Sequence, residues 1–183
     1  MALVTVVEEL AAVSASAAAA SIVGAVADEN RAPGLRGAVA SAGSDARSRL
    51  AISAVALGIG RAALTAALDS LRQSGRQSQD QEKPHWAVAD AATEVAAARV
   101  LTLRAAQVMA DQEAATGFVA MAKLMATGAA QHAVDVALRV VGPEGFARGA
   151  LLERLARDAR AVALMFGSED DLRAAAADAV LPG

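Results

Sequence analysis

The chain has 183 residues, with 17 basic and 20 acidic side chains, a net charge of −3 and only 2% aromatic residues. This composition argues against a nucleic-acid binder, which needs a basic face and usually aromatic side chains on which bases stack. The lack of cysteine excludes disulfides, thiolate zinc sites and cysteine nucleophiles, and the two histidines, His85 and His132, are too far apart in the sequence to indicate a metal site.

The first 43 residues are predicted to form a helical segment and a linker. Residues 3–29 are rich in alanine and lack proline, which favours a helix, and Pro33 with three nearby glycines indicates a loop over residues 30–43. The alanine-rich run has the apolar character of a signal peptide, but Glu8 and Glu9 precede it and no basic residue does. We therefore expect a cytoplasmic protein without an export signal.

Two long helices are predicted next. The first covers residues 44–74, where leucine recurs every seven residues, at Leu50, Leu57, Leu64 and Leu71. The second begins at Pro84, a residue suited to a first helical turn, and runs to about Gln112. Apolar residues at helical spacing predict its core face: Val88, Ala91, Val95, Ala98, Leu101, Ala105 and Val108.

A third long helix, predicted over residues 117–141, is apolar nearly all round, so we expect it at the centre of a bundle or at a subunit interface. A basic helix is predicted from about Leu151, and Ser168, followed by three acidic residues, has the pattern of a helix N-cap. The whole pattern predicts an all-α fold. We expect an up-and-down four-helix bundle of long helices in residues 44–183, with additional N-terminal and C-terminal helices.

The second half of the chain resembles a known family. Its motifs are a turn with Gly142, Gly145 and Phe146, a helix with Leu152-Glu153-Arg154 and Arg157-Asp158-Ala159-Arg160, and then Gly167-Ser168. This order resembles the C-terminal helical domain of the acyl-CoA dehydrogenase family, and residues 49–68 resemble that family's first bundle helix. The family's β-barrel domain, which covers one side of the flavin, has no counterpart between Glu29 and Ser44. We therefore expect a truncated member of the family.

The resemblance implies oxidation of an acyl thioester, in which a carboxylate removes a proton next to the carbonyl while hydride passes to flavin. Phe166 stands where the family usually has that carboxylate, and Ser48 stands at the position that some members use instead. Neither side chain can act as the base. Glu169 and Asp170 are close in sequence, but capping charges are their expected role. We therefore predict no catalytic residue and a chain inactive alone.

The same resemblance implies residues for binding. The candidates for cofactor binding are Arg76, Arg139, Gly142, Gly145 and Ser168, and the candidates for substrate binding are Arg49 and Arg160. The glycines and the serine have an alternative role, as a turn and an N-cap that the fold needs, and arginines are common on solvated surfaces. The implied cofactor is FAD, held at a subunit interface.

Three hypotheses of function follow. The first is a reduced acyl-CoA dehydrogenase-like protein that serves as an accessory or non-catalytic subunit, paired with a second copy or with a full-length acyl-CoA dehydrogenase subunit. The alternative is a stand-alone protein or enzyme that binds an acyl thioester or another small molecule on the same bundle without redox chemistry. The third is a domain with only a structural role. No membrane or nucleic-acid partner is expected.

Overall fold

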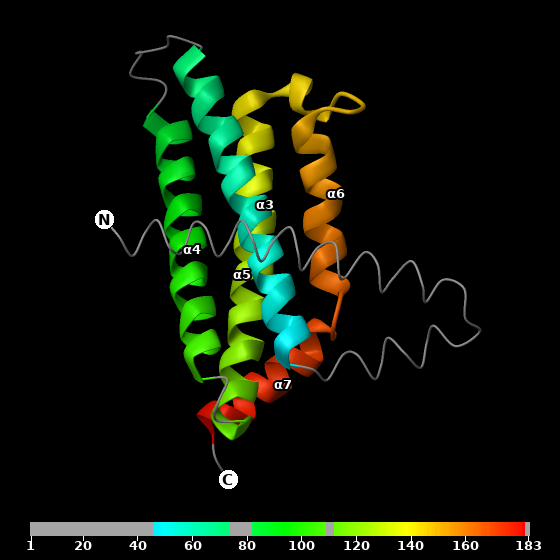
Figure 1. The fold of residues 1–183 in the computed structure, drawn as a ribbon. Coiled ribbons are helices and arrows are strands. Elements are labelled where there is room, and N and C mark those ends of the chain that lie inside the picture. The colour runs from blue at the N-terminus through cyan, green and yellow to red at the C-terminus, as the bar shows by residue number, and fades with distance from the viewer. Residues whose placement is uncertain (1–45, 74–81, 109–111, 182–183) are drawn as a thin grey trace, which may run out of the picture.

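The computed structural model describes residues 46–73, 82–108 and 112–181, which form a bundle of helices (Figure 1). The helices are α3 (Ala46–Gln73), α4 (Glu82–Gln107), α5 (Gln112–Val141), the short 3₁₀ helix η3 (Pro143–Phe146), α6 (Leu151–Leu164) and α7 (Glu169–Val180). The predicted all-α bundle is confirmed for these residues, none of which lies in a strand. The predicted segment 1–43 lies outside the described residues, and the domain boundary at residue 44 stays a prediction.

Helix α5 lies at the centre of the bundle, as its apolar character predicted. It packs against α3, α4, α6 and α7, while α4 and α6 lie on opposite sides of it (Figure 1). Alanines dominate its buried surface: Ala120, Ala122, Ala126, Ala129, Ala130, Ala133 and Ala137. Because these side chains are small, the neighbouring helices can approach closely.

The start of α5 differs from the prediction. The helix begins at Gln112, before the glycine at position 117 that the sequence pattern marked as its start. Gly117 lies inside the helix, at the point where α7 crosses it. A glycine is needed there because a β-carbon at this position would overlap the side chain of Ala179. The glycine therefore marks a close helix crossing and not a helix end.

Helix α3 buries a row of alanine and isoleucine side chains. Its core residues include Ile52, Ala56, Ile59, Ala63 and Ala67. Of the leucines that recur every seven residues, Leu64 is buried, whereas Leu50, Leu57 and Leu71 are only partly buried. The alanines of this row allow α3 and α5 to pack closely, and three of the four leucines lie at the margins of the contact. By length and composition α3 could cross a membrane, but the core helix of a soluble bundle has the same character.

Helix α4 packs with the predicted face inward. Five of the seven predicted core residues are buried, namely Val88, Ala91, Val95, Ala98 and Ala105, while Leu101 and Val108 are half-buried. Gly60 of α3 lies where α3, α4 and α5 meet, since a β-carbon there would be 3.1 Å from Cγ2 of Val95 and 3.4 Å from Cα of Ala130. These contacts fix the register of three helices at one point.

Candidate functional site

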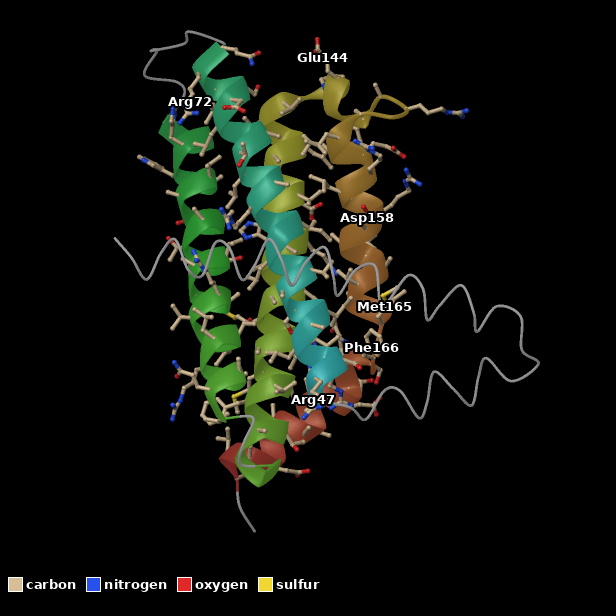
Figure 2. The ribbon with its side chains drawn as sticks, in the orientation of Figure 1. Arg47, Arg72, Glu144, Asp158, Met165 and Phe166 are labelled. Carbon is tan, nitrogen blue, oxygen red and sulfur yellow. The ribbon has the colours of Figure 1, made fainter. Side chains whose placement is uncertain are left out.

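The turn between α6 and α7 contains the position of the expected base. Met165 ends α6, and Phe166 and Gly167 follow with φ angles of 57° and 116°. A left-handed conformation is rare for an aromatic residue and costs of the order of 1–3 kcal/mol. The backbone at Phe166 is therefore strained and must be held by its surroundings. This turn lies at the end of the bundle where α3 begins, near Arg47 (Figure 2).

Two cationic side chains hold the turn. Arg49 of α3 donates from Nε to the carbonyl oxygen of Phe166 at 3.1 Å. Lys123 of α5 donates from Nζ to the carbonyl oxygens of Met165 and, at 2.9 Å, Gly167. The last carbonyls of a helix have no partner within the helix and carry partial negative charge, so cations are favourable there. We call Arg49 and Lys123 the cationic clamp.

Lys123 holds the backbone of this turn, a role that sequence reasoning did not assign. Its side chain is completely buried in the bundle. Burial, and to a lesser extent the positive charge of Arg49, lowers the pKa of Lys123 from 10.5 to about 8. The available signal was that Lys123 is the only charged side chain between Gly117 and Val134 of a largely apolar helix, because a charged group at such a position needs internal partners.

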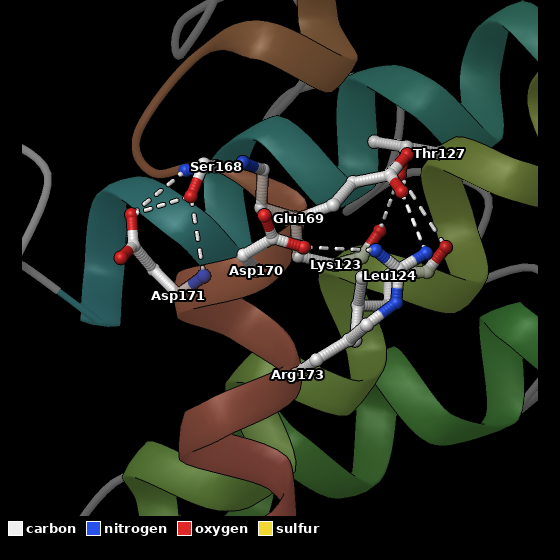
Figure 3. Close-up of polar contacts among 8 residues, drawn as sticks. All are labelled: Lys123, Leu124, Thr127, Ser168, Glu169, Asp170, Asp171 and Arg173. Atoms are coloured by element: carbon white, nitrogen blue, oxygen red, sulfur yellow. Dashed lines mark hydrogen bonds and ion pairs between the residues drawn. The ribbon is translucent and has the colours of Figure 1, made fainter.

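Ser168 caps α7 with a closed hydrogen-bond pair. Its hydroxyl donates to a carboxylate oxygen of Asp171 at 2.7 Å and accepts from the backbone N–H of Asp171 at 3.1 Å (Figure 3). The hydroxyl and backbone N–H of Ser168 hold the pKa of Asp171 below its usual value. The predicted N-cap is confirmed, and the hydroxyl that was a candidate for cofactor binding is already in use.

The acidic residues at the start of α7 also have partners. Arg173 approaches the carboxylate of Glu169 at 2.6 Å and that of Asp170 at 3.5 Å. With Asp171, these residues place three carboxylates around the N-terminus of the helix. That end of α7 therefore disfavours a phosphate, although helix N-termini often bind one.

A groove runs between α5, η3 and α6. It has a volume of about 560 Å³, and its lining includes Asp135 and Arg139 from α5, Phe146 from η3, and Arg160 from α6. Arg139 donates one hydrogen bond within α5, from Nε to the carbonyl oxygen of Asp135 at 3.2 Å. Two guanidinium groups against one carboxylate, beside the exposed ring of Phe146, suit a ligand with an anionic group and a flat apolar part.

The structure divides the predicted binding residues between two ends of α6. Gly142 and Gly145 lie at the end near Glu144, and Ser168 lies at the other end (Figures 1 and 2). The 14 residues of α6 separate these ends by about 21 Å. Arg139 and Arg160, predicted for cofactor and substrate, instead line the same groove. Arg76 lies outside the described residues.

The two glycines of the turn have different roles. Gly142 has a φ of 82°, and a β-carbon there would meet no atom within 4 Å, so a ligand could approach its backbone. Gly145 is buried, and a β-carbon there would be 3.2 Å from the side chains of Leu138 and Leu152. Gly145 therefore serves the packing of η3 against α5 and α6.

The two positions at which a base was expected are occupied by Ser48 and Phe166. Ser48 precedes Arg49, whose side chain binds the carbonyl of Phe166, so both positions lie at the same end of the bundle. Neither carries a carboxylate. His132 forms a hydrogen bond of 2.7 Å to Glu94, far from this end of α5, and both side chains are partly exposed. Within the described residues no group of three or more histidine or acidic side chains could hold a metal ion.

Comparison with known proteins agrees with this architecture. Residues 36–181 match the family model described as "Acyl-CoA dehydrogenase, C-terminal domain". The chain is 34% identical over 137 residues to 3-sulfinopropanoyl-CoA desulfinase of Paraburkholderia xenovorans, which covers 73% of this chain and 35% of that protein. It is 32% identical over 137 residues to cyclohexane-1-carbonyl-CoA dehydrogenase of Geobacter metallireducens, covering 73% of this chain and 36% of that protein.

A solved structure shows the same fold. The glutaryl-coenzyme A dehydrogenase in complex with glutaryl-CoA matches 76% of this chain and 37% of its own chain, with 28% identity and a TM-score of 0.66. The chain thus spans about a third of the length of the curated relatives it matches. The matched family model covers most of the chain. The protein therefore belongs to the acyl-CoA dehydrogenase family, and residues 36–181 correspond to its C-terminal helical domain.

Proposed function

We propose that this chain contributes its bundle, as an accessory or non-catalytic subunit, to a cytoplasmic, flavin-dependent acyl-CoA dehydrogenase assembly. The observation that carries the proposal is the turn at Phe166. A benzyl side chain occupies the expected position of the base, and Arg49 and Lys123 hold the carbonyls on this turn. The backbone of the turn is therefore held in place although the turn carries no proton acceptor. In the assembly, the base belongs to the partner subunit.

The nearby acids do not replace the missing base. Glu169 and Asp170 pair with Arg173, and Asp171 closes the cap of α7. Use of any of these carboxylates as a base would break an interaction that starts α7. The role of capping charges at the start of α7, which the sequence pattern predicted, accounts for all three carboxylates.

FAD is the cofactor that the family implies, and when bound it accepts hydride from the substrate. The groove fits its anionic part, because Arg139 and Arg160 offer two guanidinium groups and Phe146 offers a ring for a flat apolar contact. The N-terminus of α7 does not fit it, because three carboxylates surround that end. We therefore propose that the groove contacts flavin held mainly by a partner subunit, at the interface between the two.

The proposal is tested by co-expression with a full-length acyl-CoA dehydrogenase encoded in a neighbouring reading frame. We expect the two chains to elute together in size-exclusion chromatography, with flavin absorbance in the shared peak. The double variant Arg139→Ala/Arg160→Ala should weaken this association. Arg148→Ala, which removes an exposed arginine that does not line the groove, is the matched control. Separate elution at micromolar concentrations of both proteins would end the proposal.

A second candidate is binding of an acyl thioester without redox chemistry. It is favoured by one relative, whose name, 3-sulfinopropanoyl-CoA desulfinase, describes removal of sulfinate from an acyl-CoA and not dehydrogenation. In this case the purified chain is colourless and binds butyryl-CoA, used as a probe, in isothermal titration calorimetry. Arg160→Ala should abolish that heat signal. No heat signal with butyryl-CoA, together with flavin in the peak shared with the dehydrogenase, would favour the first candidate.

A further inference from the structure

The outward face of α4 carries a regular stripe of uncharged side chains. Its members follow one another at alternating steps of three and four residues, and all are exposed: Trp86, Ala89, Thr93, Ala96, Val100 and Leu103. The exposed fractions of the three largest are 60% for Trp86, 68% for Val100 and 40% for Leu103. We call these six residues the α4 stripe.

Nothing in the described bundle covers the α4 stripe. Helix α4 packs against α3 and α5 through its opposite face, and it lies at the edge of the bundle away from α6 (Figure 1). Large apolar side chains at this exposure, over about 26 Å of one helix, are typical of a surface that packs against something else. Alternating steps of three and four are the repeat by which a second helix packs along the first. The α4 stripe is therefore suited to a helix.

A matching row of residues occurs in the chain itself, within the segment 3–29 that is predicted to be helical. This segment lies outside the described residues, and the row follows from the sequence. The row has the same alternating steps and contains no charged residue: Leu3, Val6, Leu10, Val13, Ala17 and Ala20. Glu8 and Glu9 fall beside the row on a helix. We call these six residues the N-terminal row.

The sizes of the two sets are complementary when both helices run in the same direction. Small residues in the middle of the α4 stripe then face large residues of the N-terminal row: Ala89 faces Val6, Thr93 faces Leu10, and Ala96 faces Val13. Further along, large residues of α4 face small ones: Val100 faces Ala17, and Leu103 faces Ala20. Large side chains against small ones allow two helices to interlock without voids.

The path of the chain favours the same direction. Helices α3 and α4 are consecutive and antiparallel, so α4 ends at the end of the bundle where α3 begins (Figure 1). A segment parallel to α4 therefore finishes at the end of the bundle where the chain enters α3 at Ala46. In the opposite direction it would finish near Trp86, and residues 30–45 would have to run back along the bundle. Those residues span up to about 50 Å when extended, which is ample for the parallel arrangement.

We propose that residues 3–20 form a helix that packs along the α4 stripe of the same chain, parallel to α4, with the N-terminal row against the stripe. This contact covers the apolar face of α4 within one chain. It leaves the groove between α5, η3 and α6 open, since α4 and α6 lie on opposite sides of α5. The inference does not depend on flavin or on a dehydrogenase partner.

The first test uses Trp86, which is the only tryptophan of the chain, and measures the quenching of its fluorescence by acrylamide in the full chain. In the wild type the N-terminal row covers Trp86, so quenching should be weak and independent of protein concentration. Val6→Asp/Leu10→Asp places two charges in the row and should raise the quenching constant about two-fold, because the exposed fraction of Trp86 returns towards 60%.

The matched control for this test is Thr5→Asp/Ala12→Asp. It adds the same two charges on the other side of the predicted helix and should leave the quenching unchanged. Wild-type quenching as strong as that of Val6→Asp/Leu10→Asp would overturn the proposal. Protection of Trp86 that disappears on dilution would also overturn it, because the cover would then come from another molecule.

The second test reads the register and direction of the contact. The chain contains no cysteine, so introduced cysteines can form disulfides only with each other. Under mild oxidation Val6→Cys/Ala89→Cys should lose both thiols while the protein keeps the mass of one chain. Val6→Cys/Val100→Cys should keep its thiols, because Val100 lies about 16 Å further along the axis of α4. Faster oxidation of this second pair, or disulfides formed only between chains, would contradict the inference.

Discussion

Replacement of Lys123 by methionine should remove one identifiable pH dependence from the stability of the protein. In the folded chain the pKa of Lys123 is about 8, against 10.5 for an ordinary lysine. Between these pH values the unfolded chain binds a proton that the folded chain does not bind. Stability therefore rises as the pH increases through this window and is lost as the pH falls through about 8.

The size of the effect follows from the same two values. Each unit of pKa corresponds to about 1.4 kcal/mol, so the fall from 10.5 to about 8 corresponds to about 3 kcal/mol of unfolding free energy. At neutral pH the effect of Lys123→Met combines two opposite terms. The variant no longer buries a charge, but the carbonyls of Met165 and Gly167 lose their donor, which costs about 1–3 kcal/mol for each buried acceptor left without a partner. The slope against pH is therefore the decisive quantity.

The composition makes this slope measurable. The chain has no tyrosine and no cysteine, and its only other lysine is Lys83, so few groups titrate between pH 8 and pH 10.5. Urea unfolding followed by far-UV circular dichroism should show that the wild type gains about 3 kcal/mol over this window, whereas Lys123→Met gains little. Lys83→Met is the control and should keep the wild-type slope. Parallel profiles for wild type and Lys123→Met would refute the reasoning.

Three further predictions concern stability and use the midpoint of urea unfolding. Gly117→Ala should destabilise the protein by about 1–3 kcal/mol, because the added β-carbon overlaps α7. Gly128→Ala, on the same helix, adds a β-carbon that meets no atom within 4 Å and should stabilise the protein by up to about 1 kcal/mol. Equal effects of the two substitutions would contradict the packing argument. Ser168→Ala should cost about 1 kcal/mol through loss of the N-cap, and the variant should lose less stability than the wild type as acid protonates the capping carboxylate. Arg49→Met should cost about 1.5–3 kcal/mol, because the carbonyl of Phe166 loses a charged donor; no change at all would show that Lys123 alone holds the turn.

Local patterns in the sequence were sufficient for the helices and for most of their faces. The helical spacing of Val88, Ala91, Val95 and Ala98 identified the buried face of α4, and the nearly uniform apolar character of α5 identified its central position. Ser168 and the acids after it identified the start of α7. These features depend on side chains within a few residues of one another, so the sequence carries them directly.

Only the tertiary structure decided which distant residues act together. Lys123 of α5 and Arg49 of α3 hold the backbone around Phe166, and the groove joins Arg139 of α5 to Arg160 of α6. It also showed that Gly117 is a crossing point, because the close neighbour comes from α7. Periodicity gives the direction in which a side chain leaves its own helix. What that side chain meets depends on how the helices pack, because their separation and register are set by contacts summed over the whole bundle.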